Sequence, residues 1–210
     1  MKKTFVLIVL FVFPLVAYLF FASGVNNFGK LPILTKNVPE LQNQDGEPQL
    51  EGKITILGFL GNEVSKKKGN AFNLNQKIYK RFSDFNDFQL LMVVPKGHEV
   101  EVNALKDELG TLSDTKKWNF VYKDSNEIQT YFYQLKSNLE LDENLGSSYV
   151  FIIDKDKNLR GRKDDEDEGI KYGFNTASVS ELNNKMEDDV KIILAEYRLA
   201  LKRNNADRRK

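Results

Sequence analysis

Residues 149–162 read YVFIIDKDKNLRGR, and this stretch decides the fold. The apolar residues 149–153 predict a buried strand, residues 154–158 have the composition of a tight turn, and residues 159–162 begin a returning strand. Two earlier apolar runs, KITILGFL at 53–60 and FQLLMVV at 88–94, also predict buried strands. A further brief strand is expected at residues 119–122.

Helical patterns separate these strands. We expect helices at 70–85, at 100–109 with Gly110 as a C-terminal stop, at 125–135 with Ser125 as N-cap, and at 180–201. The early strand–helix–strand units imply parallel pairing, and the last two strands imply an antiparallel hairpin. The sequence therefore predicts an α/β, thioredoxin-like fold, in which helices flank a mixed sheet.

Composition removes most catalytic chemistries. The chain of 210 residues has no Cys and one His, so it lacks a thiol redox centre, a thiolate metal site and a multi-His metal cage. The single imidazole, His98, follows a turn and is expected on an exposed loop without a catalytic role. A formal net charge of +1 gives no overall attraction to nucleic acid, which we do not expect as a partner. We expect a protein that is not an enzyme and holds no cofactor or metal.

Residues 1–24 are expected to be an N-terminal membrane anchor. Lys2 and Lys3 precede an uncharged run at 5–22, which as a helix spans roughly 27 Å, close to the thickness of a bilayer core. The anchor residues of this run are Phe5, Leu10, Pro14, Leu19 and Ala22. A cleaved signal peptide ending near 22–24 is the alternative, although such apolar regions usually span about 7–15 residues. The two lysines predict a cytoplasmic N-terminus.

The rest of the chain divides into three parts. Residues 25–50 mix Asn, Gly, Pro and Gln without a sustained period and predict a linker that holds the domain off the membrane. Residues 51–201 are the expected thioredoxin-like domain, and 202–210 are a basic, polar and frayed tail. The predicted arrangement is a single-pass protein of the cell inner membrane, a signal-anchor, with its domain on the extracytoplasmic, periplasmic side.

Four stretches together resemble one family. Residues 52–60 (GKITILGFL) resemble the opening strand of the Sco/SenC proteins, which are membrane-anchored thioredoxin-fold copper chaperones. Residues 117–121 (KWNFV) resemble their W-x-F-L strand, and 149–162 resemble their FLID-KDG-RGRYDG hairpin. Residues 187–194 (EDDVKIIL) look like their closing helix, IEDIKLLL. The resemblance covers about residues 50–200 and implies the fold, a membrane tether, and a setting in respiratory-oxidase or envelope-complex assembly.

The departures from this family concern its metal ligands. In the family a C-x-x-x-C pair follows the first strand and binds copper with a His that precedes the hairpin. Residues 61–68 here read GNEVSKKK, and the stretch where the His would fall, 143–148, reads ENLGSS. Cu(I) prefers soft sulfur ligands, whereas ammonium groups repel a cation. The resemblance therefore implies a degenerate, non-redox member with a pseudo-active site.

Two charged runs are candidate contact sites. Lys66, Lys67 and Lys68 lie just before an expected helix N-terminus, where they could contact an anion or an acidic partner; a solvated surface loop is the plainer reading. Asp164, Asp165, Glu166, Asp167 and Glu168 predict a solvated, mobile loop that could contact a basic partner or a divalent ion.

Two further segments have plainer explanations. Residues 154–158 match the start of a calcium loop, but Leu159 replaces the required Gly, which favours a hairpin turn. Trp118, Tyr131, Phe132 and Tyr133 are expected in or near the core, and any exposed part of that set predicts an interface patch.

The sequence favours a membrane-tethered, non-redox, Sco-like interaction or assembly module. Its expected partners are the lipid bilayer, through the N-terminal helix, and a membrane or extracytoplasmic protein. The alternatives are a structural subunit of a membrane complex, and an anion- or divalent-ion-binding protein that uses one of the two charged runs.

Overall fold

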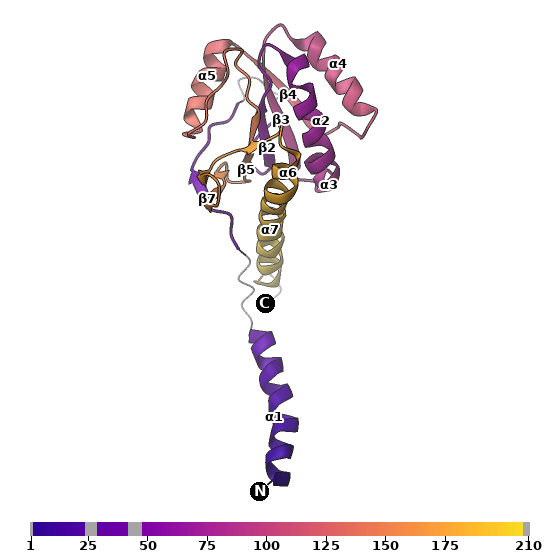
Figure 1. Cartoon of the computed structure of the whole chain (residues 1–210), viewed down its shortest axis with the longest axis vertical. Coiled ribbons are helices and arrows are strands. Elements are labelled where there is room, and N and C mark those ends of the chain that lie inside the picture. The colour runs from indigo at the N-terminus through magenta and orange to yellow at the C-terminus, as the bar shows by residue number, and fades with distance from the viewer. Residues whose placement is uncertain (1, 24–28, 42–47, 208–210) are drawn as a thin grey trace.

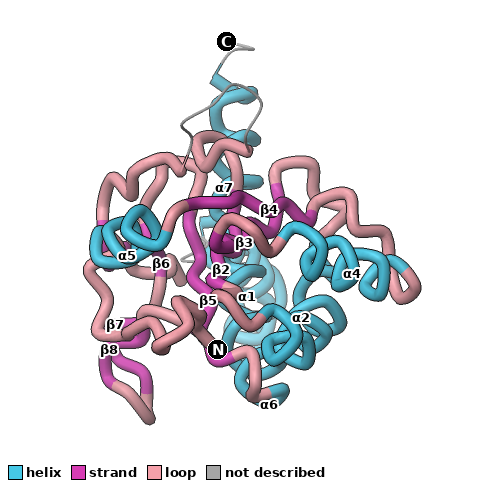
Figure 2. Tube along the Cα trace, turned by 90° about the horizontal axis from the view of Figure 1, so that it is seen from above, coloured by secondary structure: helices cyan, strands magenta, loops and turns pink. Residues whose placement is uncertain are grey.

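The computed structural model describes residues 2–23, 29–41 and 48–207, with the side chains of residues 6, 7, 9–16, 18, 29–41 and 48–200. A mixed sheet in the order β1-β6-β5-β2-β3-β4 lies at the centre of the domain (Figures 1 and 2). Strands β2, β3 and β4 are parallel, whereas β5, β6 and β1 each pair antiparallel with their neighbours. The strands are β1 (Ile33–Thr35), β2 (Ile54–Phe59), β3 (Phe88–Pro95), β4 (Trp118–Lys123), β5 (Tyr149–Ile153), β6 (Leu159–Arg160) and β9 (Phe174–Asn175), which pairs with β5.

Helices cover both faces of this sheet. The first helical segment after β2 begins as a 3₁₀ turn and contains a π-helical turn. The last helical segment begins with one α-helical turn, α6, and also contains a π-helical turn. Figure 2 shows α2 and α4 on one side of the sheet and α5 on the other. The helices are α1 (Lys2–Ser23), η1 (Val64–Lys67), α2 (Lys68–Leu74), η2 (Asn75–Tyr79), α3 (Lys80–Phe82), α4 (Glu99–Gly110), α5 (Ser125–Gln134), α6 (Val179–Glu181), η3 (Leu182–Met186) and α7 (Glu187–Asp207).

The alternation of side chains along β2 creates two cores. Ile54 and Ile56 point into the larger cluster, which packs against the helices from η1 to α4 and against η3 and α7. Leu57 and Phe59 belong to the second cluster, which packs beneath α5. Because both faces of the sheet are covered, β2 and β3 are buried along their whole length, as the sequence indicated. Their two polar side chains, Thr55 and Gln89, hydrogen-bond to each other at 2.9 Å. The α/β, thioredoxin-like architecture predicted from the sequence is confirmed.

The structure differs from the prediction for the linker at residues 25–50. In its described part, β1 adds an edge strand to the sheet, and Leu31, Val38 and Leu50 are buried. The guanidinium of Arg160 donates hydrogen bonds to the carbonyl oxygen of Leu31, and the Leu31 amide donates to Glu196 at 2.9 Å. The described part of this segment therefore belongs to the folded domain and is not a free spacer.

Several element boundaries also differ, and the helix expected at 70–85 begins earlier and ends at Phe82. Asp124 is the N-cap of α5 in place of Ser125, and its amide donates to the Glu127 carboxylate at 3.0 Å in a capping box. Gly110 is the last residue of α4, so the helix includes this glycine and does not end at Leu109. Helix α7 continues to Asp207, through most of the predicted basic tail; residues 208–210 lie outside the described residues.

Helix α1 covers the predicted anchor and includes Pro14, and Figure 1 shows it apart from the layers of the domain. The side chains of Leu10 and Pro14 are exposed, whereas those of Phe5, Leu19 and Ala22 lie outside the described residues. Within the described part of the chain, no helix combines the length and apolarity needed to cross a membrane. The bilayer span and the topology stay predictions.

Candidate functional site

The structure brings together the two stretches that the family resemblance placed at the active site. Leu60, at the end of β2, bridges antiparallel to Gly146. The Ser147 amide donates to the carbonyl of Phe59 at 2.9 Å, and the Asn62 amide donates to the carbonyl of Asn144 at 2.7 Å. The segment after β2 and the segment before β5 are therefore joined through their backbones.

Glycine is required where the chain crosses this junction. Gly61 has a φ of +70°. A Cβ there would lie 2.5 Å from the backbone nitrogen of Gly146 and closer still to the carbonyl oxygen of Asn144. No side chain fits such a space, since both neighbours are backbone atoms in hydrogen bonds.

Asp142 holds the other side of the junction with both carboxylate oxygens. Its Oδ1 accepts hydrogen bonds from the amides of Asn144 at 3.0 Å and Gly146 at 2.8 Å. These bonds stabilise a tight loop in which Leu145 has a φ of +62°, an unfavourable conformation for a bulky residue. Its Oδ2 forms an ion pair with the Lys67 ammonium, 2.9 Å away. One carboxylate thus fixes the loop and pairs with the helix that follows β2.

Lys67 is the central cation of the site. Its side chain is 18% exposed, and its Nζ lies 2.9 Å from Asp142 and 3.5 Å from the Ser148 hydroxyl. Burial by itself would raise the pKa of Asp142, but the Lys67 ammonium and the two loop amides together hold that pKa below its usual value. The Asp142 carboxyl is therefore ionised near neutral pH at the place where the two segments meet.

The structure corrects the predicted setting of the three lysines. Lys66 and Lys67 lie in the 3₁₀ turn η1 and Lys68 begins α2, so they are inside the helical segment and not in a loop before it. Their ammonium groups also point to different partners. Lys66 pairs with Glu63 at 2.6 Å, and Lys68 pairs with Glu108 of α4. The structure therefore presents three separate ion pairs and no shared anion site.

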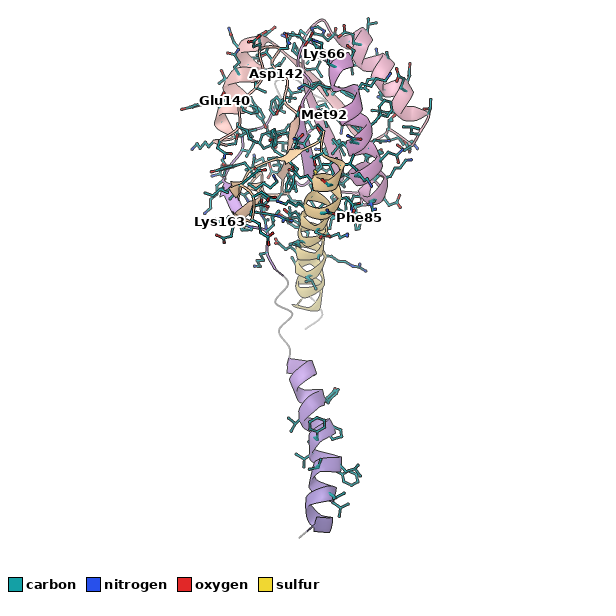
Figure 3. All side chains as sticks on the ribbon, viewed as in Figure 1. Lys66, Phe85, Met92, Glu140, Asp142 and Lys163 are labelled. Carbon is teal, nitrogen blue, oxygen red and sulfur yellow. The ribbon has the colours of Figure 1, made fainter. Side chains whose placement is uncertain are left out.

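A small polar cavity of about 180 Å³ opens between these segments. Glu63 links its two sides, because it pairs with Lys66 and accepts a 2.7 Å hydrogen bond from the Asn144 side chain. Figure 3 shows Lys66 and Asp142 at the end of the domain that faces away from α1. The cavity is lined by Leu60, Glu63, Lys66, Lys67, Asn70, Asp142, Asn144 and Ser148.

The residues of this cavity do not fit copper. Cu(I) prefers thiolate or thioether sulfur, and the lining offers ammonium, carboxylate, amide and hydroxyl groups. The thioether of Met92 lies under the neighbouring backbone of Gly58, but it is buried and offers one soft ligand at most. The Lys67 ammonium would repel any cation placed beside Asp142. Elsewhere in the described chain, no group of three or more His, Asp or Glu residues is arranged to hold a metal ion.

The acidic run 164–168 is not the mobile loop that its charge predicted. It forms the end of a hairpin between β7 (Arg162–Asp165) and β8 (Gly169–Lys171). Asp165 is buried and accepts two hydrogen bonds from Lys185, while Glu168 pairs with the fully buried Lys171 at 2.5 Å. Asp167 also pairs with Lys185, at 2.7 Å, so Asp164 and Glu166 are the exposed members of the run without an ion pair among the described residues.

The remaining candidate residues have structural roles. His98 is the N-cap residue of α4, and its Nδ1 lies 2.9 Å from Glu101. Asp154 closes the hairpin turn by accepting hydrogen bonds from the amides of Asp156 and Asn158, as the turn prediction required. Trp118, Tyr131 and Phe132 are buried, as expected. Tyr133 is exposed instead.

Comparison with known proteins finds solved structures of similar fold at low sequence identity. No family model matches the chain, and no curated protein matches it. BsSco, a member of the Sco family of cytochrome c oxidase assembly proteins, is similar over 77% of this chain and 95% of its own, with a TM-score of 0.50 and 14% identity. Copper-bound ScoI of Arabidopsis thaliana is similar over 68% and 86% of the two chains, with a TM-score of 0.42 and 15% identity.

A thioredoxin family thiol:disulfide interchange protein of Chlorobium tepidum is similar over 64% of this chain and 80% of its own, with a TM-score of 0.41 and 14% identity. The likeness to BsSco confirms the Sco-like thioredoxin fold that the sequence resemblance implied. At 14% identity it shows the fold and not the activity. The chain thus has a Sco-like fold without any cysteine and with its one His away from the junction, at the start of α4.

Sequence reasoning found the two segments of the site but missed the residues that join them. Asp142 was not singled out, although Asp, Asn and Gly at positions 142, 144 and 146 have the composition of a tight turn. Glu63 and Ser148 carried no signal of their own, since their partners lie in distant parts of the sequence.

Proposed function

We propose that this protein is a membrane-tethered, non-redox, Sco-like interaction or assembly module whose domain faces the extracytoplasmic side. The observation that carries the proposal is the Lys67–Asp142 ion pair at the junction of the two segments. A charged pair between segments joined through their backbones stabilises a surface, but it offers no soft ligand to Cu(I) and no sulfur to a disulfide.

The absence of thiol chemistry follows from the whole sequence. Thiol–disulfide exchange proceeds by attack of a thiolate on a disulfide sulfur. The chain contains no cysteine in its 210 residues, so it cannot form the mixed disulfide. A Sco-like fold without that chemistry can still bind another protein through the surface that surrounds the cavity.

The chemistry of the cavity rim supports binding to a protein. Lys66 has a side chain that is 71% exposed, and Glu63 and Asn144 lie beside it. Together they present a cation, a carboxylate and an amide beside the two segments that are joined through their backbones. These groups can hydrogen-bond to a polar protein surface. BsSco belongs to a family of cytochrome c oxidase assembly proteins, and assembly of a respiratory oxidase or of another envelope complex is the corresponding role proposed here.

The membrane tether rests on the sequence. The uncharged run at 5–22 has the length of a bilayer span, and Lys2 and Lys3 favour a cytoplasmic N-terminus. Carbonate extraction of membranes and protease protection of a C-terminal tag test both points. Release by carbonate, or a tag that stays inaccessible from the extracytoplasmic side, would contradict them.

A complementation experiment tests the assembly role. Deletion of the gene should lower the amount of an assembled membrane complex, seen on native gels, while its individual subunits are still made. The wild-type chain should restore assembly and Lys66→Glu should not, because this change reverses an exposed charge at the cavity rim at little cost to folding. Lys163→Glu is the matched control, since Figure 3 shows Lys163 at the opposite end of the domain.

The same strains distinguish the alternatives. Equal complementation by Lys66→Glu and wild type would contradict a binding role for the cavity rim. Stoichiometric recovery of the protein in the finished complex would identify a structural subunit instead of an assembly factor. Tight, stoichiometric Cu(I) binding by the purified full chain, measured by competition with a chromogenic chelator, would contradict the non-redox proposal.

A further inference from the structure

A groove of about 550 Å³ runs along α5 on the flank of the domain. Phe132 forms its floor, and Leu139 and Leu141 line it from the segment that follows the helix. Phe132 packs within the second core cluster, and the two leucines are half-buried against that cluster. The groove is therefore a rigid apolar surface built on the core of the domain.

Tyr133 stands at the rim of this groove. Its side chain is 84% exposed, the largest exposed fraction among the described large hydrophobic side chains. Its hydroxyl makes no hydrogen bond with any described residue, so nothing in the domain fixes the ring. A large aromatic side chain that projects beside an apolar groove is typical of a contact site, because burying both surfaces removes apolar area from water.

Two unpaired opposite charges flank the ring and the groove. The side chains of Lys136 and Glu140 are exposed and have no ion-pair or hydrogen-bond partner among the described residues. Figure 3 shows Glu140 at the outer edge of the domain. By contrast, Lys66 and Lys67 at the cavity and Lys171 and Lys185 at the hairpin are all paired with carboxylates.

This surface is complementary to itself. In a two-fold symmetric contact, residue i of the first copy meets residue j of the second, and residue j of the first copy meets residue i of the second. Lys136 of each copy would then meet Glu140 of the other, while each Tyr133 ring would enter the facing groove. One symmetric contact thus neutralises both free charges and buries both rings.

We propose that the groove beside α5 is the contact between two copies of this chain. The inference is independent of the function proposed above. A contact centred on two aromatic rings and two exposed ion pairs is small compared with stable dimer interfaces, which bury about 1,200–2,000 Å². It therefore forms a weak dimer whose population depends on concentration.

The position of the groove fits such a dimer. Figure 1 shows α5 on the side of the domain and not at the end that points toward α1. A two-fold axis parallel to the long axis of the molecule therefore joins two domains side by side. The groove and the cavity at Lys67 and Asp142 are lined by different residues.

The test is a measurement of self-association with the full chain in detergent micelles. Sedimentation velocity over a dilution series should show a monomer–dimer equilibrium for the wild type. Tyr133→Ser should weaken the dimer at least tenfold. Lys136→Glu and Glu140→Lys should each weaken it about fivefold to tenfold, because each change turns both ion pairs of the symmetric contact into like-charge pairs. Lys106→Glu, on α4 across the sheet, is the matched control and should leave the dissociation constant unchanged.

Mixing the two charge variants gives the sharpest result. Neither single variant pairs well with itself, but Lys136→Glu chains and Glu140→Lys chains form two attractive pairs with each other. Energy transfer between differently labelled chains should therefore recover on mixing, and the double variant should dimerise as the wild type does.

Three results would overturn the proposal. The first is a wild-type chain that is monomeric at every concentration. The second is association that Tyr133→Ser, Lys136→Glu and Glu140→Lys all leave unchanged, which would assign it to α1. The third is a failure of the mixed variants to associate. If the variants instead lower binding of a different purified protein to a monomeric chain, the groove is a docking site for that protein and the symmetric contact is wrong.

Discussion

Replacement of Gly61 by alanine tests the geometry of the junction directly. At φ +70° an L-residue loses about 1–2 kcal/mol relative to glycine. The new Cβ would also lie 2.5 Å from the backbone nitrogen of Gly146, and overpacking of this kind costs typically ~1–3 kcal/mol. Gly61→Ala should therefore lower the free energy of unfolding by roughly 2–5 kcal/mol.

Two other glycines separate the two contributions. Gly52 has a φ of +75°, but a Cβ added there would have no atom within 4 Å, so Gly52→Ala should cost only the backbone contribution of about 1–2 kcal/mol. Gly69 lies near the start of α2 with open space around it, and Gly69→Ala should stabilise the fold by up to ~1 kcal/mol. The expected order of stability is Gly69→Ala, wild type, Gly52→Ala and Gly61→Ala.

Urea unfolding followed by tryptophan fluorescence measures this order. The chain has one tryptophan, Trp118, which is buried at the start of β4 and reports on the domain without a contribution from α1. If Gly61→Ala is no less stable than Gly52→Ala, the segments around Gly61 and Gly146 are not joined as described, and the site built on that junction is wrong.

Three further predictions concern charged groups. Folding lowers the pKa of Asp142, so its charge stabilises the fold above the unfolded pKa near 3.9. This contribution is lost as the pH falls through the folded pKa. The urea midpoint of Asp142→Asn should therefore fall less than that of the wild type below about pH 4. Arg160→Leu leaves the buried Asp154 without its 2.9 Å partner and should lower stability by about 3–5 kcal/mol, whereas a loss below about 1 kcal/mol in urea unfolding would show that this pair is well solvated. Lys185→Ala removes the cation that pairs with the acidic hairpin and should raise amide hydrogen exchange at 162–171 about tenfold without affecting β3; unchanged exchange would show that the backbone alone holds the hairpin.

The strands of the fold could be predicted because each carries its own signal. The runs at 53–60, 88–94 and 149–153 are apolar on both faces, and a strand covered by helices on both sides requires that pattern. The turn at 154–158 was equally local, since Asp154 bonds to amides within four residues of itself. Local composition therefore predicted the central sheet and its hairpin.

The charged segments could not be predicted in the same way. A run of acids indicates a solvated loop only if no cation reaches it, and the cation that pairs with the buried Asp165 is Lys185, on another element. The lysines after β2 likewise looked like a free cluster, although Lys67 pairs with Asp142 and Lys68 with Glu108. Charge pairs between distant segments leave no periodic pattern in the sequence.

Over the described part of the linker, the prediction was wrong for a related reason. Its Pro, Gly and Asn content indicated extended chain or a short hairpin. Strand β1 is indeed extended, but one short strand with mixed burial gives no sign that it completes a sheet. Its place depends on Arg160, whose guanidinium holds the carbonyl of Leu31, and on Glu196 of α7. Neither partner can be recognised from residues 25–50 themselves.

The clamp at Leu31 determines how mechanical force would pass through the molecule. A pull on the preceding chain reaches Arg160 and Glu196 before it reaches the hydrogen bonds of β1. The load is then shared by the last helix and the sheet. The hydrogen bonds of the three-residue strand β1 are therefore not broken one after another from its end. A domain pulled by that route should resist extension as one unit, with the yield point at a buried guanidinium.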